Sequence, residues 1–312
     1  MRRWIACSAA AAALFLSFMA SPARAAEKVV FGYFPVADFL MTFIAKDKGF
    51  FDRHGIDATI QMMTTNATSI PAALISNSIQ VGGTTVPVVL QADDSGLDVA
   101  MVANGGVTYE GFHPIALVVA ADSTAKTAKD LEGKTIGLTG LNNLAHILLV
   151  KWLSLNGADP SKVHIVEANI QQMPDIMKAK QLDGVVAIEP FMSRIIAAGT
   201  GRIFAYEQDI QPMGSSTMVW AVAGDYAKAH PDTIRNIRAA LDDALAYHNA
   251  HPDDDDAIMA HYLPMPAAIL KMLPRSKFAN KVDPGTIKFM SDTMLEQKLL
   301  TKPADKTAVI LP

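Results

Sequence analysis

One pattern recurs through the first half of the chain and restricts what the chain can fold into. A run of apolar and β-branched residues ends in small or polar residues, and a stretch with helical spacing follows it. The pattern occurs at residues 28–51, 56–78 and 79–96, and another apolar run lies at 98–104. Strands that alternate with helical stretches of about ten or more residues form βαβ units. The sequence therefore predicts an α/β fold built on parallel sheets.

The same pattern starts again further along the chain and predicts a second α/β unit. We place this unit at residues 118–217, and the apolar run at 215–224 reads as a strand that returns to the first unit. The chain after that strand is mostly helical. The predicted organisation is a discontinuous first lobe, residues 26–117 and 218–312, and a second lobe between its two parts. A cleft between two such lobes is a preferred site for a small molecule.

The N-terminus has the composition of a secretory signal. Arg2 and Arg3 precede an apolar stretch at residues 4–20, and a small-residue A-x-A site follows. This order predicts that residues 1–25 are a cleaved signal peptide and that the protein is periplasmic. An uncleaved membrane anchor and twin-arginine export are the alternatives. The single cysteine, Cys7, lies inside this segment, so the mature chain is expected to have no disulfide and no thiolate metal site.

The composition of the remaining chain is that of a globular protein with an acidic surface. Half of all residues are hydrophobic and 19% are charged. After the signal segment, 24 basic and 31 acidic residues give a net charge of −7. Nucleic acid and anionic membranes are poor partners for such a surface.

The candidate ligand contacts lie in loops that follow the predicted strands. In open α/β sheets, ligands bind outside the carboxyl ends of the strands. Most of these loops precede a predicted helix, whose free backbone N–H groups can also bind an anion. The candidate residues are Phe34, Pro35, Asp38, Phe39, Asn66, Thr68, Gly83, Thr84, Thr85, Thr139, Gly140, Asn142, Asn143 and Glu189.

A structural role is the alternative for many of these positions. Asp38, Thr68 or Ser69, Thr85 and Asn143 stand where a helix N-cap is expected, and capping is the commonest use of these residue types there. The glycines can serve backbone geometry alone.

Glu189 is the candidate with the most specific chemistry. It ends a buried apolar strand, where an unpaired carboxylate is costly. Its expected partner is either Arg194 or an amine or ring N–H of a ligand. A ligand contact would favour a zwitterion or a pyrimidine over a simple anion such as nitrate.

No metal site and no cofactor are predicted. The acidic run at residues 253–256 is better explained as charges that suit a helix start, because consecutive side chains point in different directions. His54, His113 and His146 do not have the spacing of metal ligands.

Several segments together resemble a known family. They are "FGYFPVADFLMTFIAKDKGFFDRHGID" from residue 31, "GKTIGL" from 133, "DGVVAIEPF" from 183 and "YLPMP" from 262. The chain resembles extracytoplasmic solute-binding proteins of ABC importers, in the group that binds aliphatic sulfonates, taurine, nitrate and thiamine-pyrimidine precursors. The strand-end loops differ from many of these proteins in having few tryptophans and few basic residues, which leaves the ligand class open.

The resemblance implies a fold and a function. The fold is the type II periplasmic-binding-protein fold, with two lobes that each hold a mainly parallel sheet and are joined by two hinge strands. The protein would then be a monomer that captures a sulfonate-, taurine- or pyrimidine-like solute between its lobes and delivers it to a membrane permease.

Two other functions remain open from the sequence. One is an enzyme on the same fold, but the related thiamine-pyrimidine synthases carry a cysteine cluster that is absent here. The sequence also has no G-x-S-x-G, H-E-x-x-H or P-loop motif, so no enzymatic activity is predicted. The other is a sensor subunit that presents its bound ligand to a membrane kinase.

Overall fold

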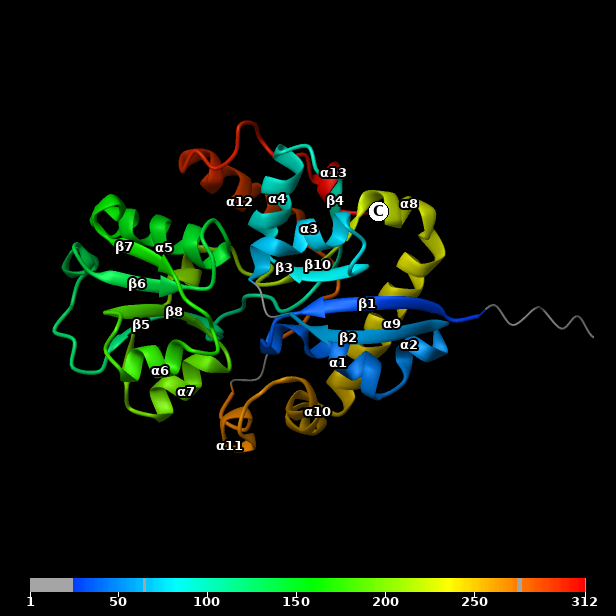
Figure 1. Cartoon of the computed structure of the whole chain (residues 1–312), viewed down its shortest axis with the longest axis horizontal. Coiled ribbons are helices and arrows are strands. Elements are labelled where there is room, and N and C mark those ends of the chain that lie inside the picture. The colour runs from blue at the N-terminus through cyan, green and yellow to red at the C-terminus, as the bar shows by residue number, and fades with distance from the viewer. Residues whose placement is uncertain (1–24, 64–65, 274–276, 312) are drawn as a thin grey trace, which may run out of the picture.

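The computed structural model describes residues 25–63, 66–273 and 277–311. The predicted signal segment therefore lies, up to residue 24, outside the described residues, as do Thr64 and Thr65 of one candidate loop. The described chain forms two five-stranded sheets, each flanked by helices (Figure 1).

The first sheet has the strand order β2-β1-β3-β10-β4. Its strands are β1 (Glu27–Tyr33), β2 (Ile56–Met62), β3 (Val81–Thr84), β4 (Val99–Asn104) and β10 (Val219–Ala223). Strand β1 pairs in parallel with β2 and with β3, whereas β10 is antiparallel to β3 and β4.

The second sheet has the order β7-β6-β8-β5-β9. Its strands are β5 (Ile115–Ala120), β6 (Thr135–Leu138), β7 (His164–Glu167), β8 (Gly184–Ile188) and β9 (Gly201–Ala205). Strand β6 is parallel to β7 and β8, and β5 is antiparallel to β8 and β9. In each sheet the antiparallel strand is the one that enters from the other lobe, so the prediction of two mainly parallel sheets is confirmed.

Helices cover both sheets, and the C-terminal helices pack on the first lobe (Figure 1). The helices are α1 (Leu40–Asp47), α2 (Phe50–Arg53), α3 (Ile70–Ile75), α4 (Val86–Asp94), α5 (Leu144–Leu155), α6 (Met173–Lys178), α7 (Phe191–Ala197), α8 (Gly224–Ala229), α9 (Pro231–Ala250), α10 (Asp255–Tyr262), α11 (Ala267–Leu270), α12 (Pro284–Glu296) and α13 (Lys306–Val309). Within the described ranges, none of these helices combines the length and the apolar character needed to cross a bilayer.

Aromatic packing fixes the loop that leaves β1. The ring of Phe39 lies 4.5 Å from that of Trp220 on β10, and Phe31 lies 5.6 Å from the same ring. Phe39 also covers Gly83 on β3, because a Cβ atom on Gly83 would lie 2.5 Å from the Phe39 ring. The loop is therefore held against the sheet by its own phenylalanine, Phe39. Phe34 and Pro35 lie at the carboxyl end of β1.

Two antiparallel segments connect the lobes, as the prediction of two hinge strands requires. The Gly105 N–H donates to the Met218 carbonyl at 2.8 Å, and the Thr217 N–H donates to the Gly106 carbonyl at 3.0 Å. The pairing continues with the Thr108 N–H, which bonds to the Ser215 carbonyl at 2.9 Å.

The predicted limits of the lobes differ slightly from the limits of the strands. The limit between residues 117 and 118 falls inside β5, which lies in the second sheet over its whole length. The limit between residues 217 and 218 falls just before β10. The strands thus favour a first lobe that ends in the crossing segment before residue 115.

Candidate functional site

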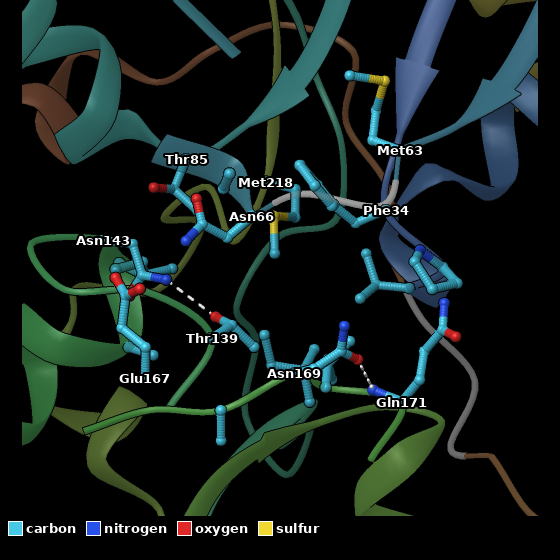
Figure 2. A pocket seen from close by; sticks show the side chains of 18 of the residues that line it. Phe34, Met63, Asn66, Thr85, Thr139, Asn143, Glu167, Asn169, Gln171 and Met218 are labelled. Atoms are coloured by element: carbon cyan, nitrogen blue, oxygen red, sulfur yellow. Dashed lines mark hydrogen bonds between the residues drawn. The ribbon is translucent and has the colours of Figure 1, made fainter. Parts of the chain in front are cut away.

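A cavity of about 430 Å³ lies between the lobes, at the carboxyl ends of the parallel strands of both sheets (Figure 2). The first lobe supplies segments after β1, β2 and β3, and the second lobe supplies segments after β6 and β7 and the last residue of β8, Ile188. This is the position at which ligands bind in open α/β sheets.

The first-lobe side of the cavity is largely apolar. Phe34, Pro35 and Val36 follow β1, and Met63 and Met218 lie near them. Figure 2 shows Phe34, Met63 and Met218 along one side of the cavity. Such a surface can contact a ring or an alkyl chain, and the methionines can adapt to its shape.

Side-chain amides and hydroxyls from both lobes form a polar part of the lining. The Asn143 Nδ2 atom donates to the Thr139 hydroxyl at 2.9 Å, and the Asn143 Oδ1 atom accepts from the His146 N–H at 3.1 Å. Asn143 is thus the N-cap of α5, as predicted. Across the cavity, the Asn66 Oδ1 atom accepts a hydrogen bond from the Thr68 hydroxyl. The Nδ2 atom of Asn66 faces the second lobe.

Thr85 and Asn143 are equally buried, but of the two only Asn143 has side-chain hydrogen bonds within the described part of the chain. Thr85 is 2% exposed, and its hydroxyl has no hydrogen-bond partner among the described residues. It occupies the N-cap position of α4, but its side chain makes no capping bond, so the prediction that it is a side-chain cap is wrong.

The last residue of β7, Glu167, and the segment after it complete the lining. The Glu167 Oε1 atom accepts from the Leu141 N–H at 2.9 Å, and the Asn169 Oδ1 atom accepts from the Gln171 N–H at 2.9 Å. Sequence reasoning missed these three cavity residues, Glu167, Asn169 and Gln171. The signal was present, because the polar run "EANIQQ" follows an apolar strand as the other candidate loops do.

The structure brings together six of the predicted site residues in this cavity. They are Phe34, Pro35, Asn66, Thr85, Thr139 and Asn143. The other eight lie outside its lining, and their predicted ligand contacts stay predictions.

Asp38 lies behind the cavity wall, in contact with the crossing segments. It is buried, and its Oδ1 atom accepts a hydrogen bond from the Thr217 hydroxyl. Burial raises the pKa of Asp38 above its usual value. The prediction that Asp38 caps a helix is wrong, because it lies inside the 3-10 helix η1 (Ala37–Phe39) and makes no capping bond.

Three other candidates support the first-lobe wall from within. Phe39 and Gly83 pack on each other, as described above. The Thr84 hydroxyl donates to the Ala67 carbonyl at 3.0 Å and so holds the 3-10 helix η2 (Ala67–Ser69) beside the cavity. Neither Thr68 nor Ser69 makes a side-chain capping bond, so that part of the capping prediction is also wrong.

Gly140 and Asn142 lie where the lobes meet. A Cβ atom on Gly140 would lie 3.3 Å from the Asn66 Nδ2 atom, so glycine permits the close approach of the two lobes here. Asn142 has a φ of 61°, and its carbonyl accepts from the Gln91 Nε2 atom of α4 at 2.9 Å.

Glu189 has a partner that the sequence did not suggest. Its Oε1 atom accepts from the Ser193 hydroxyl at 2.8 Å, and its Oε2 atom accepts from the Ser193 N–H at 3.0 Å. Arg194 pairs instead with Asp175, at 3.7 Å, so the predicted pairing of Glu189 with Arg194 is wrong. Burial raises the pKa of the Glu189 carboxyl, and the negative charge of Asp38 raises it further.

The fold and the cavity define a two-lobed binding protein of the type II periplasmic-binding fold. The family model described as "NMT1/THI5 like" matches residues 36–255, and the chain belongs to this family.

Relatives with named roles match the same region. The taurine-binding periplasmic protein of Escherichia coli (strain K12) is 26% identical over 249 residues, which cover 77% of this chain and 72% of that protein. The bicarbonate transport ATP-binding protein CmpC of Synechocystis is 27% identical over 240 residues, or 69% of this chain. This chain spans only 34% of the length of that larger relative.

A solved structure shares the fold over nearly the whole chain. The alkanesulfonate-binding protein SsuA of Xanthomonas axonopodis pv. citri, bound to MOPS, superposes with a TM-score of 0.76 at 19% identity. The match covers 91% of this chain and 98% of that one.

Proposed function

We propose that the chain is the periplasmic solute-binding component of an ABC importer. It holds a small organic solute between its lobes and passes the solute to a membrane permease. The observation that carries this proposal is the cavity of about 430 Å³, whose walls come from the strand ends of both lobes. The names of the taurine-binding and alkanesulfonate-binding relatives support it.

The groups in the cavity suit the binding and orientation of a solute. They are side-chain amides, hydroxyls and one carboxylate, set beside an apolar wall. Small-molecule sites commonly have this composition, in which few polar groups fix the orientation and apolar groups supply contact area. The sulfonate-, taurine- or pyrimidine-like solutes named above are of a size that suits this cavity.

The lobes are joined in a way that allows capture by closure. In the described part of the chain, the two crossing segments and the side-chain bonds of Gln91 and Gln297 connect the second lobe to the first. Because both lobes line the cavity, a bound solute stabilises the conformation in which they lie together.

A solute screen tests the proposal. Mature protein, residues 26–312, is heated with sulfonates, taurine, nitrate, amines, amides, pyrimidines and divalent metals, one at a time. A solute at a hundred times its dissociation constant adds about 2.7 kcal/mol to the free energy of unfolding, which is a readily measured shift. Small-angle scattering of the same samples should show a more compact protein with the bound solute.

A matched pair of variants locates the binding. Asn66→Ala changes the cavity and should abolish most of the shift. Asn249→Ala changes an exposed asparagine at the end of α9 and should leave the shift unchanged. Turnover of a panel compound by the protein, without a saturable shift, would contradict the proposal and favour an enzyme on this fold.

A further inference from the structure

The cavity lining has a single ionisable side chain among the described residues, and this side chain is acidic. Glu167 supplies that carboxylate, and none of the described lining residues is a lysine, arginine or histidine. The net charge of this lining is therefore negative, which is unexpected for a protein with a relative named for alkanesulfonate binding.

Glu167 lies where an anionic ligand would otherwise be favoured. The N-terminal end of α5 borders the cavity through Leu144 and Ala145, and helix N-termini attract negative charge. The Glu167 Oε1 atom accepts from the Leu141 N–H in the loop that leads into α5. The carboxylate of the protein thus already provides a negative charge at this end of the helix.

The histidine closest in sequence to this helix start does not supply a compensating positive charge. The Asn142 N–H donates to the His146 Nδ1 atom at 2.9 Å, so this nitrogen acts as an acceptor and carries no proton. Burial also lowers the pKa of His146, which favours the neutral ring.

Other groups of the cavity can accept hydrogen bonds from a ligand. The Thr85 hydroxyl is buried without a partner among the described residues. The side chain of Gln171 lies at the opposite end of the lining from Glu167 in Figure 2. An apolar body between these groups would contact Phe34 and Met218.

We propose that the solute carries an N–H donor group, such as an amine, an amidine or an amide, which binds Glu167. It is neutral or singly positive, its body is apolar, and it is not a simple anion such as nitrate or an alkanesulfonate. This inference rests on the proposed solute-binding function.

Four compounds with the same ring test the charge preference. Benzamidine and benzamide carry N–H donors, whereas benzoate and benzenesulfonate are anions of similar size. Titration calorimetry on the mature protein should show that benzamidine and benzamide bind at least about tenfold more tightly than either anion, because hydrogen bonds to charged groups are among the stronger ones.

A glutamine variant tests the role of Glu167 itself. Glu167→Gln keeps an acceptor for the Leu141 N–H but removes the charge, so benzamidine should lose about tenfold or more in affinity. Benzamide should lose less. The matched control is Glu132→Gln, since the Glu132 Oε1 atom also accepts a backbone N–H, that of Asp159 at 3.0 Å, but lies outside the cavity.

The outcomes separate this inference from the proposed function. Tighter binding of benzenesulfonate than of benzamidine, an unchanged benzamidine affinity in Glu167→Gln, or no binding of either N–H compound would overturn the inference. If nitrate or an alkanesulfonate then bound saturably, the solute-binding function would stand with a different ligand class. Failure of every solute in the wider screen would overturn both.

Discussion

Glu207 is a fully buried carboxyl group in the second lobe, near the point where the chain crosses back. Its Oε2 atom accepts from the Leu117 N–H at 2.8 Å, and its Oε1 atom has no partner among the described residues. Burial raises the pKa of Glu207 to about 8. The folded protein therefore holds this carboxyl in its neutral form at neutral pH.

The pKa of Glu207 predicts a dependence of stability on pH. The folded state binds a proton that the unfolded chain releases at its ordinary pKa of 4.5, so the contribution to stability is present below that value and falls as the pH rises to about 8. Glu207→Gln should raise the free energy of unfolding at pH 8 by at least about 1 kcal/mol, since each pKa unit is worth about 1.4 kcal/mol. Urea unfolding of both proteins at pH 5 and pH 8 measures this difference in the free energy of unfolding.

An exposed glutamate provides the control for this experiment. Glu110→Gln should leave the difference between pH 5 and pH 8 as it is in the unchanged protein. If Glu207→Gln has the same pH dependence as the unchanged protein, the carboxyl does not titrate as described.

Asp38 couples the first lobe to the crossing segments. A Cβ atom on Gly106 would lie 2.4 Å from the Asp38 Oδ1 atom, and the Thr217 hydroxyl donates to that same oxygen. Asp38→Ala should lower the free energy of unfolding by about 1 kcal/mol, because it removes one buried hydrogen bond while the Thr217 hydroxyl keeps the Gly106 carbonyl as an acceptor. A double-mutant cycle with Thr217→Val should give a coupling of about 1 kcal/mol. Strictly additive effects would show that the two side chains do not interact.

Helix α5 depends on one side chain for its start. The Asn143 Oδ1 atom accepts from the His146 N–H, and the helix begins at Leu144, inside the cavity lining. Asn143→Ala should lower the free energy of unfolding by about 1 kcal/mol through loss of the cap. Asn143→Asp keeps a side-chain acceptor and should recover most of the lost free energy of unfolding. Urea unfolding of the three proteins measures both effects.

Strand β3 shows why loop position alone does not identify a ligand contact. Gly83 and Thr84 end a strand that points at the cavity, yet Phe39 covers the glycine and Thr84 bonds to η2. The next residue, Thr85, is the one that lines the cavity. A difference of one residue along a strand moves a side chain to the other face of the sheet.

The lobes are held together by contacts between elements that are distant in the sequence. The Gln91 Nε2 atom donates to the Asn142 carbonyl at 2.9 Å, and the Gln297 Nε2 atom donates to the Ile147 carbonyl at 2.9 Å. Lys151 of α5 pairs with Glu296 of α12. These bonds favour the arrangement in which the lobes lie close together.

Removal of these bonds should open the molecule. The double variant Gln91→Ala and Gln297→Ala should have a larger radius of gyration without solute, as measured by small-angle scattering. Solute affinity should fall by up to about thirtyfold, because the two lost hydrogen bonds contribute about 1 kcal/mol each and only the closed population binds. Gln80→Ala, within the first lobe, should leave the scattering unchanged. A double variant as compact as the unchanged protein would contradict this account.

The sequence by itself determined the fold class and the edge of the sheets at which a site forms. Strand runs such as 28–34 and 185–188 are apolar and short, and helical stretches follow them. This alternation can be recognised locally, and it indicates an α/β fold with parallel sheets. The cap at Asn143 and the cavity positions of Phe34 and Thr139 follow from the same local rules.

Only the tertiary structure decided the direction of the charged and buried side chains. Asp38 faces Thr217, and Glu189 bonds to Ser193 beyond the cavity lining, whereas Glu167 lies in that lining. The partner of Asp38 depends on how the first lobe and a crossing segment meet, whereas Glu189 and Ser193 are four residues apart and meet at the start of α7. Spacing along one strand or helix carries no information about a contact such as that of Asp38 with Thr217, because burial and the choice of a distant partner are properties of the packed molecule.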